Sequence, residues 1–143
     1  MRFRWSALAV FVLALVLMPR DGQAQGTARK AVVTVKQNYP NPFNPETRGE
    51  FEIGCTDVGA QYRVSVKIYN LLMQSVATPV LQGGKASVAG GTALTSVLLP
   101  CGQYTWYWNG NYQNTRKEAA SGVYILVVDV NGQRVTRTMT NAK

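Results

Sequence analysis

Apolar and polar residues alternate one by one along most of the chain after residue 48. The clearest run is 62–69, where Tyr, Val, Val and Ile alternate with Arg, Ser, Lys and Tyr. A period of two is typical of a β-strand with one buried face. Weaker runs predict strands near residues 50–55, 75–81, 95–99 and 103–109. Residues 122–130 are nearly all apolar and predict a central strand covered on both faces. Asn131-Gly132 predicts a hairpin turn leading into a strand over 133–139.

About seven short strands separated by turn signals predict an all-β fold, an immunoglobulin-like antiparallel β-sandwich. Tyr104, Trp106 and Trp108 share one strand face. This pattern favours a sandwich core over a platform for stacking sugars or bases. Tyr107, on the opposite face, is the better candidate for a surface contact. Residues 82–95 are rich in glycine and small side chains and predict a flexible loop, with a short edge strand at 86–88 as the alternative.

The first 24 residues have the pattern of a cleaved signal peptide. Arg2 and Arg4 precede an unbroken apolar run of twelve residues, 7–18, and Gly22 and Ala24 supply small residues before a cleavage site. Twelve apolar residues are too few for a transmembrane helix, which needs about 20, so a cleaved signal peptide is favoured over the alternative of a retained signal anchor. The expected organisation is a signal peptide (1–24), a short N-terminal segment (25–36) and one domain (37–143), with no transmembrane segment in the mature chain.

Charge and cysteine content refine this picture. Removing residues 1–24 takes away three of the 15 Lys/Arg and one of the 7 Asp/Glu, which leaves a net charge of +6. The basic residues are scattered in the sequence and form no nucleic-acid-binding motif. Weak binding to acidic polysaccharide or to lipid headgroups is the alternative role for this charge.

Cys55 and Cys101 favour one disulfide in an exported protein over two separate buried thiols. Two thiolates without any histidine are a poor zinc site, and we expect no cofactor.

The residue content also argues against an enzyme. The chain has no histidine, no Gly-x-Ser-x-Gly element and no glycine-rich phosphate loop. Glu50 and Glu52 share one face of a predicted strand, but the alternation places both in solvent. Ser121 has no neighbouring base to activate it. We therefore expect no active site.

Residues 37–47, Gln-Asn-Tyr-Pro-Asn-Pro-Phe-Asn-Pro-Glu-Thr, form a proline-rich segment that we call the strap. Proline fixes φ and removes a backbone donor, and it restricts the residue before it to extended or turn geometry. Tyr39 and Phe43 supply two aromatic anchors. We expect the strap to run extended along the edge of the domain, with both aromatic rings packed on it. The alternative is a surface loop that presents a PxxP motif to a partner.

Four motifs in fixed order resemble a known family. They are Gln-Asn-Tyr-Pro-Asn-Pro-Phe-Asn-Pro at 37–45, Val-Lys-Ile-Tyr-Asn at 66–70, Trp-Asn-Gly at 108–110 and Ser-Gly-Val-Tyr-Ile at 121–125. Together they resemble the type A C-terminal sorting domain of bacterial type IX secretion cargo, which is similar to the Ig-like domain of flagellar hook-capping proteins. The resemblance runs from about Val35 to Lys143.

The resemblance implies a targeting module rather than a catalyst. After export to the periplasm, an outer-membrane translocon would recognise the domain and a sortase-like peptidase would process it, so that the protein is secreted or reaches the cell surface. The residues that match the family's recognition elements lie in the strap, in the Gly-x-Tyr element and near the basic C-terminus. They are Pro40, Asn41, Pro42, Gly122, Tyr124, Arg134, Arg137 and Lys143.

The chain departs from the family pattern at four places. Asn109 follows the tryptophan where the family usually has Asp, and Thr115 stands where a Gly is usual. The turn at 71–73 lacks the expected Gly, and the loop over 82–95 is longer than usual.

The alternative to a sorting module is a structural subunit of the cell envelope or of an extracellular assembly that associates with copies of itself. A third hypothesis is a carbohydrate-binding accessory domain that uses Tyr107 or the glycine-rich loop.

Overall fold

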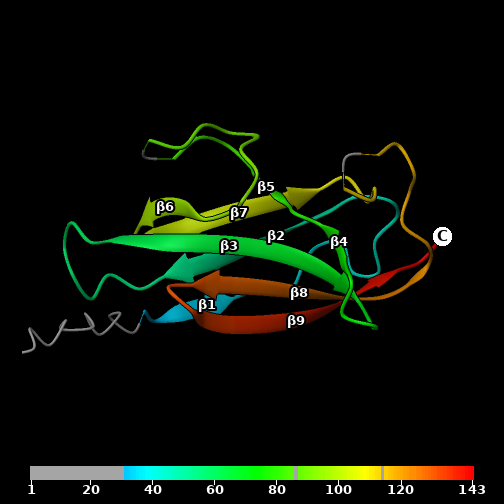
Figure 1. The fold of residues 1–143 in the computed structure, drawn as a ribbon, viewed down its shortest axis with the longest axis horizontal. Coiled ribbons are helices and arrows are strands. Elements are labelled where there is room, and N and C mark those ends of the chain that lie inside the picture. The colour runs from blue at the N-terminus through cyan, green and yellow to red at the C-terminus, as the bar shows by residue number, and fades with distance from the viewer. Residues whose placement is uncertain (1–30, 86, 114) are drawn as a thin grey trace, which may run out of the picture.

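The structure is a computed structural model that describes residues 31–85, 87–113 and 115–143. The expected signal peptide and residues 25–30 lie outside the described residues. The described chain is all-β and forms two antiparallel sheets that face each other (Figure 1). The strands are β1 (Val33–Val35), β2 (Thr47–Ile53), β3 (Gln61–Asn70), β4 (Ser75–Ala77), β5 (Val80–Leu81), β6 (Val97–Pro100), β7 (Gly102–Trp108), β8 (Gly122–Val130) and β9 (Gln133–Asn141).

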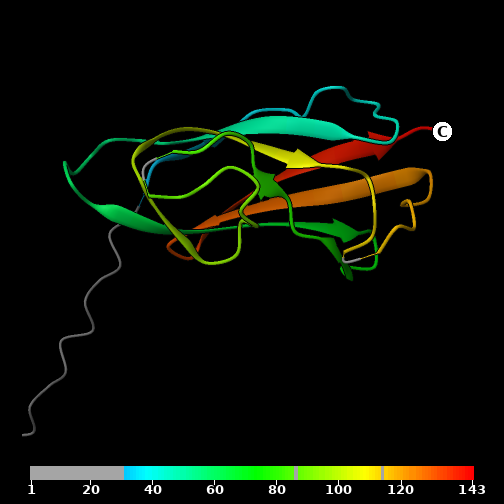
Figure 2. The same ribbon diagram turned by 90° about the horizontal axis from the view of Figure 1, so that it is seen from above.

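One sheet has the order β1-β2-β7-β5, and the other has the order β4-β3-β8-β9 with β6 also paired to β3. The view from above shows the two layers, with β2 and β7 in one and β3 and β8 in the other (Figure 2). Side chains of alternate residues from both sheets meet in a single apolar core, as the period-two pattern predicts. Tyr104, Trp106 and Trp108 are all buried in it, which confirms their assignment to the core.

The described residues form nine strands rather than about seven, for two reasons. The predicted strand over 75–81 is two strands, β4 and β5, which belong to different sheets. The break falls at Thr78 and Pro79, and proline has no N–H to continue a ladder. The chain also enters the first sheet earlier than residue 37, since β1 pairs with β2 and Val35 is buried.

Strand β8 is central, between β3 and β9, but only one of its faces is covered. Tyr124, Leu126 and Val128 are buried, whereas Val123 is 37% exposed and Val127 is half-buried on the outer face. The prediction of a strand covered on both faces is therefore wrong. An all-apolar sequence reports which side chains could be buried, and it does not say whether a second layer exists to cover them.

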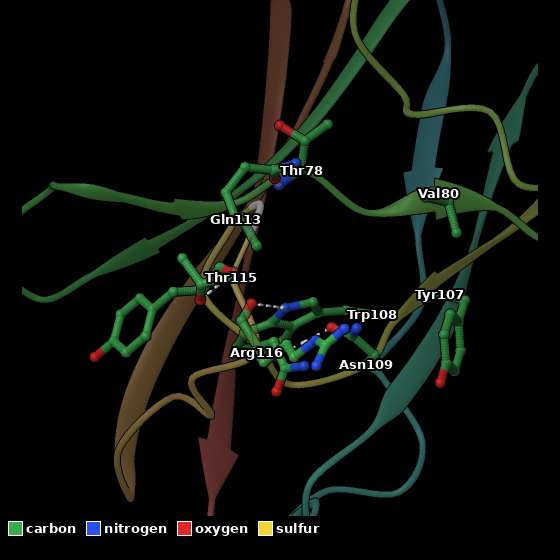
Figure 3. A pocket seen from close by; sticks show the side chains of 11 residues that line it. Thr78, Val80, Tyr107, Trp108, Asn109, Gln113, Thr115 and Arg116 are labelled. Atoms are coloured by element: carbon green, nitrogen blue, oxygen red, sulfur yellow. Dashed lines mark hydrogen bonds between the residues drawn. The ribbon is translucent and has the colours of Figure 1, made fainter.

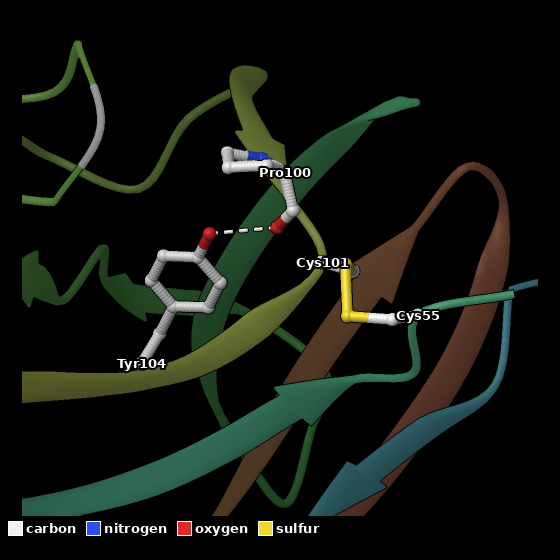
Figure 4. Close-up of a disulfide and its surroundings, with 4 residues drawn as sticks. All are labelled: Cys55, Pro100, Cys101 and Tyr104. Carbon is white, nitrogen blue, oxygen red and sulfur yellow. Dashed lines mark hydrogen bonds between the residues drawn. A yellow bond between two sulfur atoms is a disulfide. The ribbon is translucent and has the colours of Figure 1, made fainter. Parts of the chain in front are cut away.

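Cys55 and Cys101 are joined in a disulfide, as predicted, with their Cα atoms 5.0 Å apart (Figure 4). Cys55 follows the end of β2, and Cys101 lies between β6 and β7. Because Ile53 pairs with Gly102, the two cysteines flank the same end of the β2–β7 ladder. Beside the bridge, the Tyr104 hydroxyl donates to the carbonyl oxygen of Pro100 at 2.6 Å (Figure 4).

The strap differs from the extended, doubly anchored segment that we expected. Phe43 is buried, but Tyr39 is 72% exposed, so only one of the two aromatic residues is an anchor. The backbone follows a series of bends, and the peptide bonds before Pro40, Pro42 and Pro45 are cis. The strap therefore docks through one ring and through hydrogen bonds.

Candidate functional site

The strap lies against the last residues of the chain. The Phe43 N–H donates to the Thr140 carbonyl at 2.9 Å, and the Ala142 N–H donates back to the Phe43 carbonyl at 3.0 Å. The side-chain oxygen of Asn41 accepts from the Thr140 N–H at 3.0 Å. A segment near the start of the domain thus forms a short parallel pairing with the end of β9.

Three aromatic rings join the strap to both sheets. The ring centroids of Phe43 and Trp108 are 5.4 Å apart, and those of Trp108 and Tyr124 are 5.7 Å apart, both edge-to-face. This geometry is favourable for aromatic pairs and adds to the burial of the three side chains. The cluster contains one residue from each of three motifs that are far apart in the sequence.

Gly110 brings the Trp-Asn-Gly motif against the strap from another side. Its φ is +80°, and a Cβ built on it would lie 1.9 Å from the carbonyl oxygen of Pro45. Only glycine fits such a close backbone approach combined with a left-handed conformation. The remaining motif, Val-Lys-Ile-Tyr-Asn at 66–70, reaches the same end of the fold, because Asn70 pairs with Tyr124 across β3 and β8.

Polar side chains that the sequence analysis did not single out hold this end together. Asn38 is buried and donates to Thr47 Oγ1 and to the Pro40 carbonyl, both at 2.9 Å. Asn141 is also buried and donates to the carbonyls of Ala119 and Ala120. An asparagine in a turn-rich segment or at the end of a strand carries no sequence signal for burial, so only the tertiary contacts identify these two residues.

The predicted recognition residues divide into two groups in space. Pro40, Asn41 and Pro42 are exposed beside the end of β9, and Gly122 pairs there with Asn141. At the same end, the Lys143 ammonium forms a 2.8 Å ion pair with Glu118, and its backbone N–H donates to Ser121 Oγ at 3.2 Å.

The other two cations lie elsewhere. Arg134 pairs with Asp129 across the β8–β9 hairpin, at the opposite end of β9. A strand rises about 3.3 Å per residue, so Arg134 is about 23 Å from Asn141. Arg137 lies midway and is half-buried. We therefore define the C-terminal end site as the strap, Gly110, Gly122, Tyr124 and residues 140–143, without these two arginines.

A pocket of about 390 Å³ opens beside this site, between the β4–β5 connection and the segment after β7 (Figure 3). Trp108 forms part of its wall, and the indole N–H donates to the Asn111 carbonyl at 2.8 Å. Asn109 and Thr115, two of the four departures from the family pattern, both line the pocket. These two departures therefore lie close together in the structure, at the same pocket.

Two tyrosines at this end have raised pKa values. Burial raises the pKa of the Tyr124 hydroxyl, which donates to the Ala120 carbonyl at 2.7 Å. The pKa of Tyr107 is raised mainly by its 2.7 Å hydrogen bond to the Glu46 carboxylate. Both phenols therefore stay neutral donors at ordinary pH and act as structural hydrogen-bonding groups.

Within residues 31–143, apart from 86 and 114, no three His, Cys, Asp or Glu side chains gather in a way that could hold a metal ion. The same part of the chain contains no helix long and apolar enough to cross a membrane. Comparison with known proteins found no matching protein-family model, curated protein or solved structure.

Proposed function

We propose that this chain is a non-catalytic, exported recognition module of the sorting type, read by type IX outer-membrane secretion machinery. The observation that carries the proposal is the meeting of four separated motifs at one end of the fold, around the last residues of the chain. Phe43, Trp108 and Tyr124 join three of them, and Gly110 contacts the strap directly. Residues spread over some ninety positions thus pack together beneath the exposed Pro40, Pro42 and Lys143.

An immunoglobulin-like topology is part of this proposal. The sheet orders β1-β2-β7-β5 and β4-β3-β8-β9 correspond to strands A-B-E-D and C′-C-F-G of that fold. Tyr124 stands near the start of the F-equivalent strand, and its hydroxyl donates to the backbone four residues upstream. This contact is like the tyrosine corner of immunoglobulin-type domains.

Preorganisation supports recognition at the C-terminal end site. The strap is fixed by Asn38, Phe43 and Asn41, and Lys143 is held by two contacts of its own. A partner that binds a surface already ordered in this way loses little conformational entropy on binding. Pro40, Pro42 and Lys143 are exposed on that surface.

The proposed location is the periplasm and then the cell surface or the medium. The Cys55–Cys101 disulfide supports passage through an oxidising compartment. The proposed partners are the outer-membrane translocon and a sortase-like peptidase. Their binding would be through surface shape and side chains rather than through a bound cofactor.

A reporter fusion tests the proposal. The domain is placed behind a signal peptide and a periplasmic reporter in a bacterium with an active type IX system, and cell-surface and medium fractions are assayed. We expect export of the intact fusion and periplasmic retention of Lys143→Glu, which reverses the charge of an exposed side chain at the C-terminal end site. Arg63→Glu, which makes the same change of charge on the outer face of β3 outside the four motifs, should be exported normally.

Surface variants are needed because deleting the C-terminus would be ambiguous. Removing residues 135–143 takes away most of β9 together with the fully buried Met139. Such a deletion would stop export by unfolding the domain. Each variant should therefore first show an unchanged melting temperature. Periplasmic retention of the intact fusion would contradict the sorting proposal.

The structural-subunit hypothesis has one specific observation in its favour. The turn between β3 and β4 exposes three consecutive apolar side chains, with Leu71 at 65%, Leu72 at 79% and Met73 at 57%. Exposed apolar clusters of this kind often mark protein contacts. If the intact fusion stays periplasmic while the wild-type protein sediments as large assemblies that Leu72→Ser dissolves, self-association replaces sorting as the function.

A further inference from the structure

The outer face of the five-stranded sheet forms a groove of about 720 Å³. It runs over β3, β8 and β9, from Met73 at one end to Asn131 at the other. The register places one side chain from each strand in successive rows across the sheet. Ser65, Asp129 and Arg134 form one row, and Lys67, Val127 and Thr136 form the next. The groove is separate from the C-terminal end site.

The sheet gathers basic residues that look scattered in the sequence. Arg63, Lys67 and Arg134 line the groove, and Asp129 is the one carboxylate among its lining residues. Asp129 already pairs with Arg134 at 2.9 Å. In the described part of the chain, Arg63 and Lys67 form no ion pair. Two uncompensated cations therefore face the groove.

The other lining groups are suited to hydroxylated ligands. Ser65 Oγ accepts from the Ser96 N–H at 2.9 Å, which leaves its O–H free to donate outward. Thr136 adds a second hydroxyl, and Tyr69 adds a half-buried ring. Aromatic rings pack against the apolar faces of ligands, and hydroxyl groups fix their orientation.

We propose that this groove binds an acidic polysaccharide, a linear chain of sugars bearing carboxylate or sulfate groups. Arg63 and Lys67 lie on one face of β3, four residues apart, which is about 13 Å along the strand. A polymer with repeated negative charges can therefore contact both cations at once. The site is independent of the proposed sorting role.

Two other occupants fit less well. A second copy of this chain, bound through the same face, would bring Arg63 and Lys67 against their own counterparts, which is unfavourable. An acidic peptide that binds by strand addition needs the backbone groups of a sheet edge. The groove lies on the face of the sheet, where side chains rather than backbone groups are presented.

Binding should be measured for the exported protein, with its disulfide formed, against polygalacturonate, with poly-L-glutamate and neutral dextran as comparison polymers. We expect binding to polygalacturonate that weakens as salt increases and no binding to dextran. Lys67→Gln should weaken binding about fivefold, the effect of losing one exposed charge contact. The Arg63→Gln, Lys67→Gln pair should weaken it about 25-fold if the two contacts are independent and equal.

Arg48→Gln is the matched control, because it removes the same charge from an exposed position on the other sheet. Affinity equal to wild type for Arg48→Gln supports a specific groove. An equal loss from Arg48→Gln and Lys67→Gln would mean attraction by net charge alone and would overturn the proposal. Poly-L-glutamate bound as tightly as polygalacturonate, with no effect of Tyr69→Ala on the ratio, would overturn the choice of a sugar polymer.

Discussion

At the scale of single residues, Gly110 has the least room for a side chain among the glycines of residues 31–143. A Cβ there would both occupy a left-handed conformation and collide with the Pro45 carbonyl. We expect Gly110→Ala to lower the free energy of unfolding by about 3 kcal/mol or more, measured by urea denaturation.

The control for Gly110 is Gly132→Ala, since Gly132 has a similar φ of +85° but open space around it. This variant carries only the conformational cost of about 1 kcal/mol. Equal losses for the two variants would mean that the contact with the strap contributes nothing.

Tyr124 links a single hydroxyl to the pH dependence of stability. Burial raises its pKa in the folded protein above the ordinary value of about 10. Its contribution is therefore fully present below about pH 10 and is lost as the pH rises through the folded-state pKa. We expect the urea midpoint to fall above about pH 10.

Tyr124→Phe should cost about 1 kcal/mol at neutral pH through the lost hydrogen bond to Ala120, and it should make the alkaline decline shallower. Tyr39→Phe, at an exposed side chain, should leave the stability at neutral pH unchanged. An unchanged alkaline decline in Tyr124→Phe would mean that Tyr124 does not contribute to it.

At the scale of elements, the strap should behave as part of the fold with a single aromatic anchor. Phe43→Ala removes a fully buried ring and its edge contact with Trp108, so we expect a loss of about 3–5 kcal/mol in unfolding free energy. Tyr39→Ala should change stability by less than about 0.5 kcal/mol. Chemical denaturation of both variants is the measurement, and similar values for the two would contradict the single-anchor arrangement.

At the scale of the whole molecule, the disulfide closes a loop between residues 46 positions apart. The chain-entropy estimate for such a loop is about 4 kcal/mol of stabilisation. The double variant Cys55→Ser, Cys101→Ser should therefore unfold at a clearly lower urea concentration than the oxidised protein. The slope of the unfolding free energy against urea concentration should be compared as well, because it changes if the unfolded state becomes more expanded. A midpoint within error of wild type would show that the packing at this end suffices alone.

Strand character could be predicted from the sequence because it depends on local alternation. The runs that became β2, β3, β7 and β8 were identified, and the disulfide followed from the cysteine count and the expected compartment. The division of residues 75–81 between two sheets was missed, as was β1. Short strands of two or three residues contain too few positions for a period to be visible.

For the candidate sites, the sequence determined which motifs are present and which side chains alternate toward a core. Only the tertiary structure decided that the strap, Trp108, Gly110 and Tyr124 meet beside the C-terminus, and that Arg134 and Arg137 do not join them. It also decided that Arg63, Lys67 and Arg134 share one groove. The physical reason is that strand periodicity is fixed by local backbone geometry, whereas neighbours across a sheet are set by which distant strands pair and in which register.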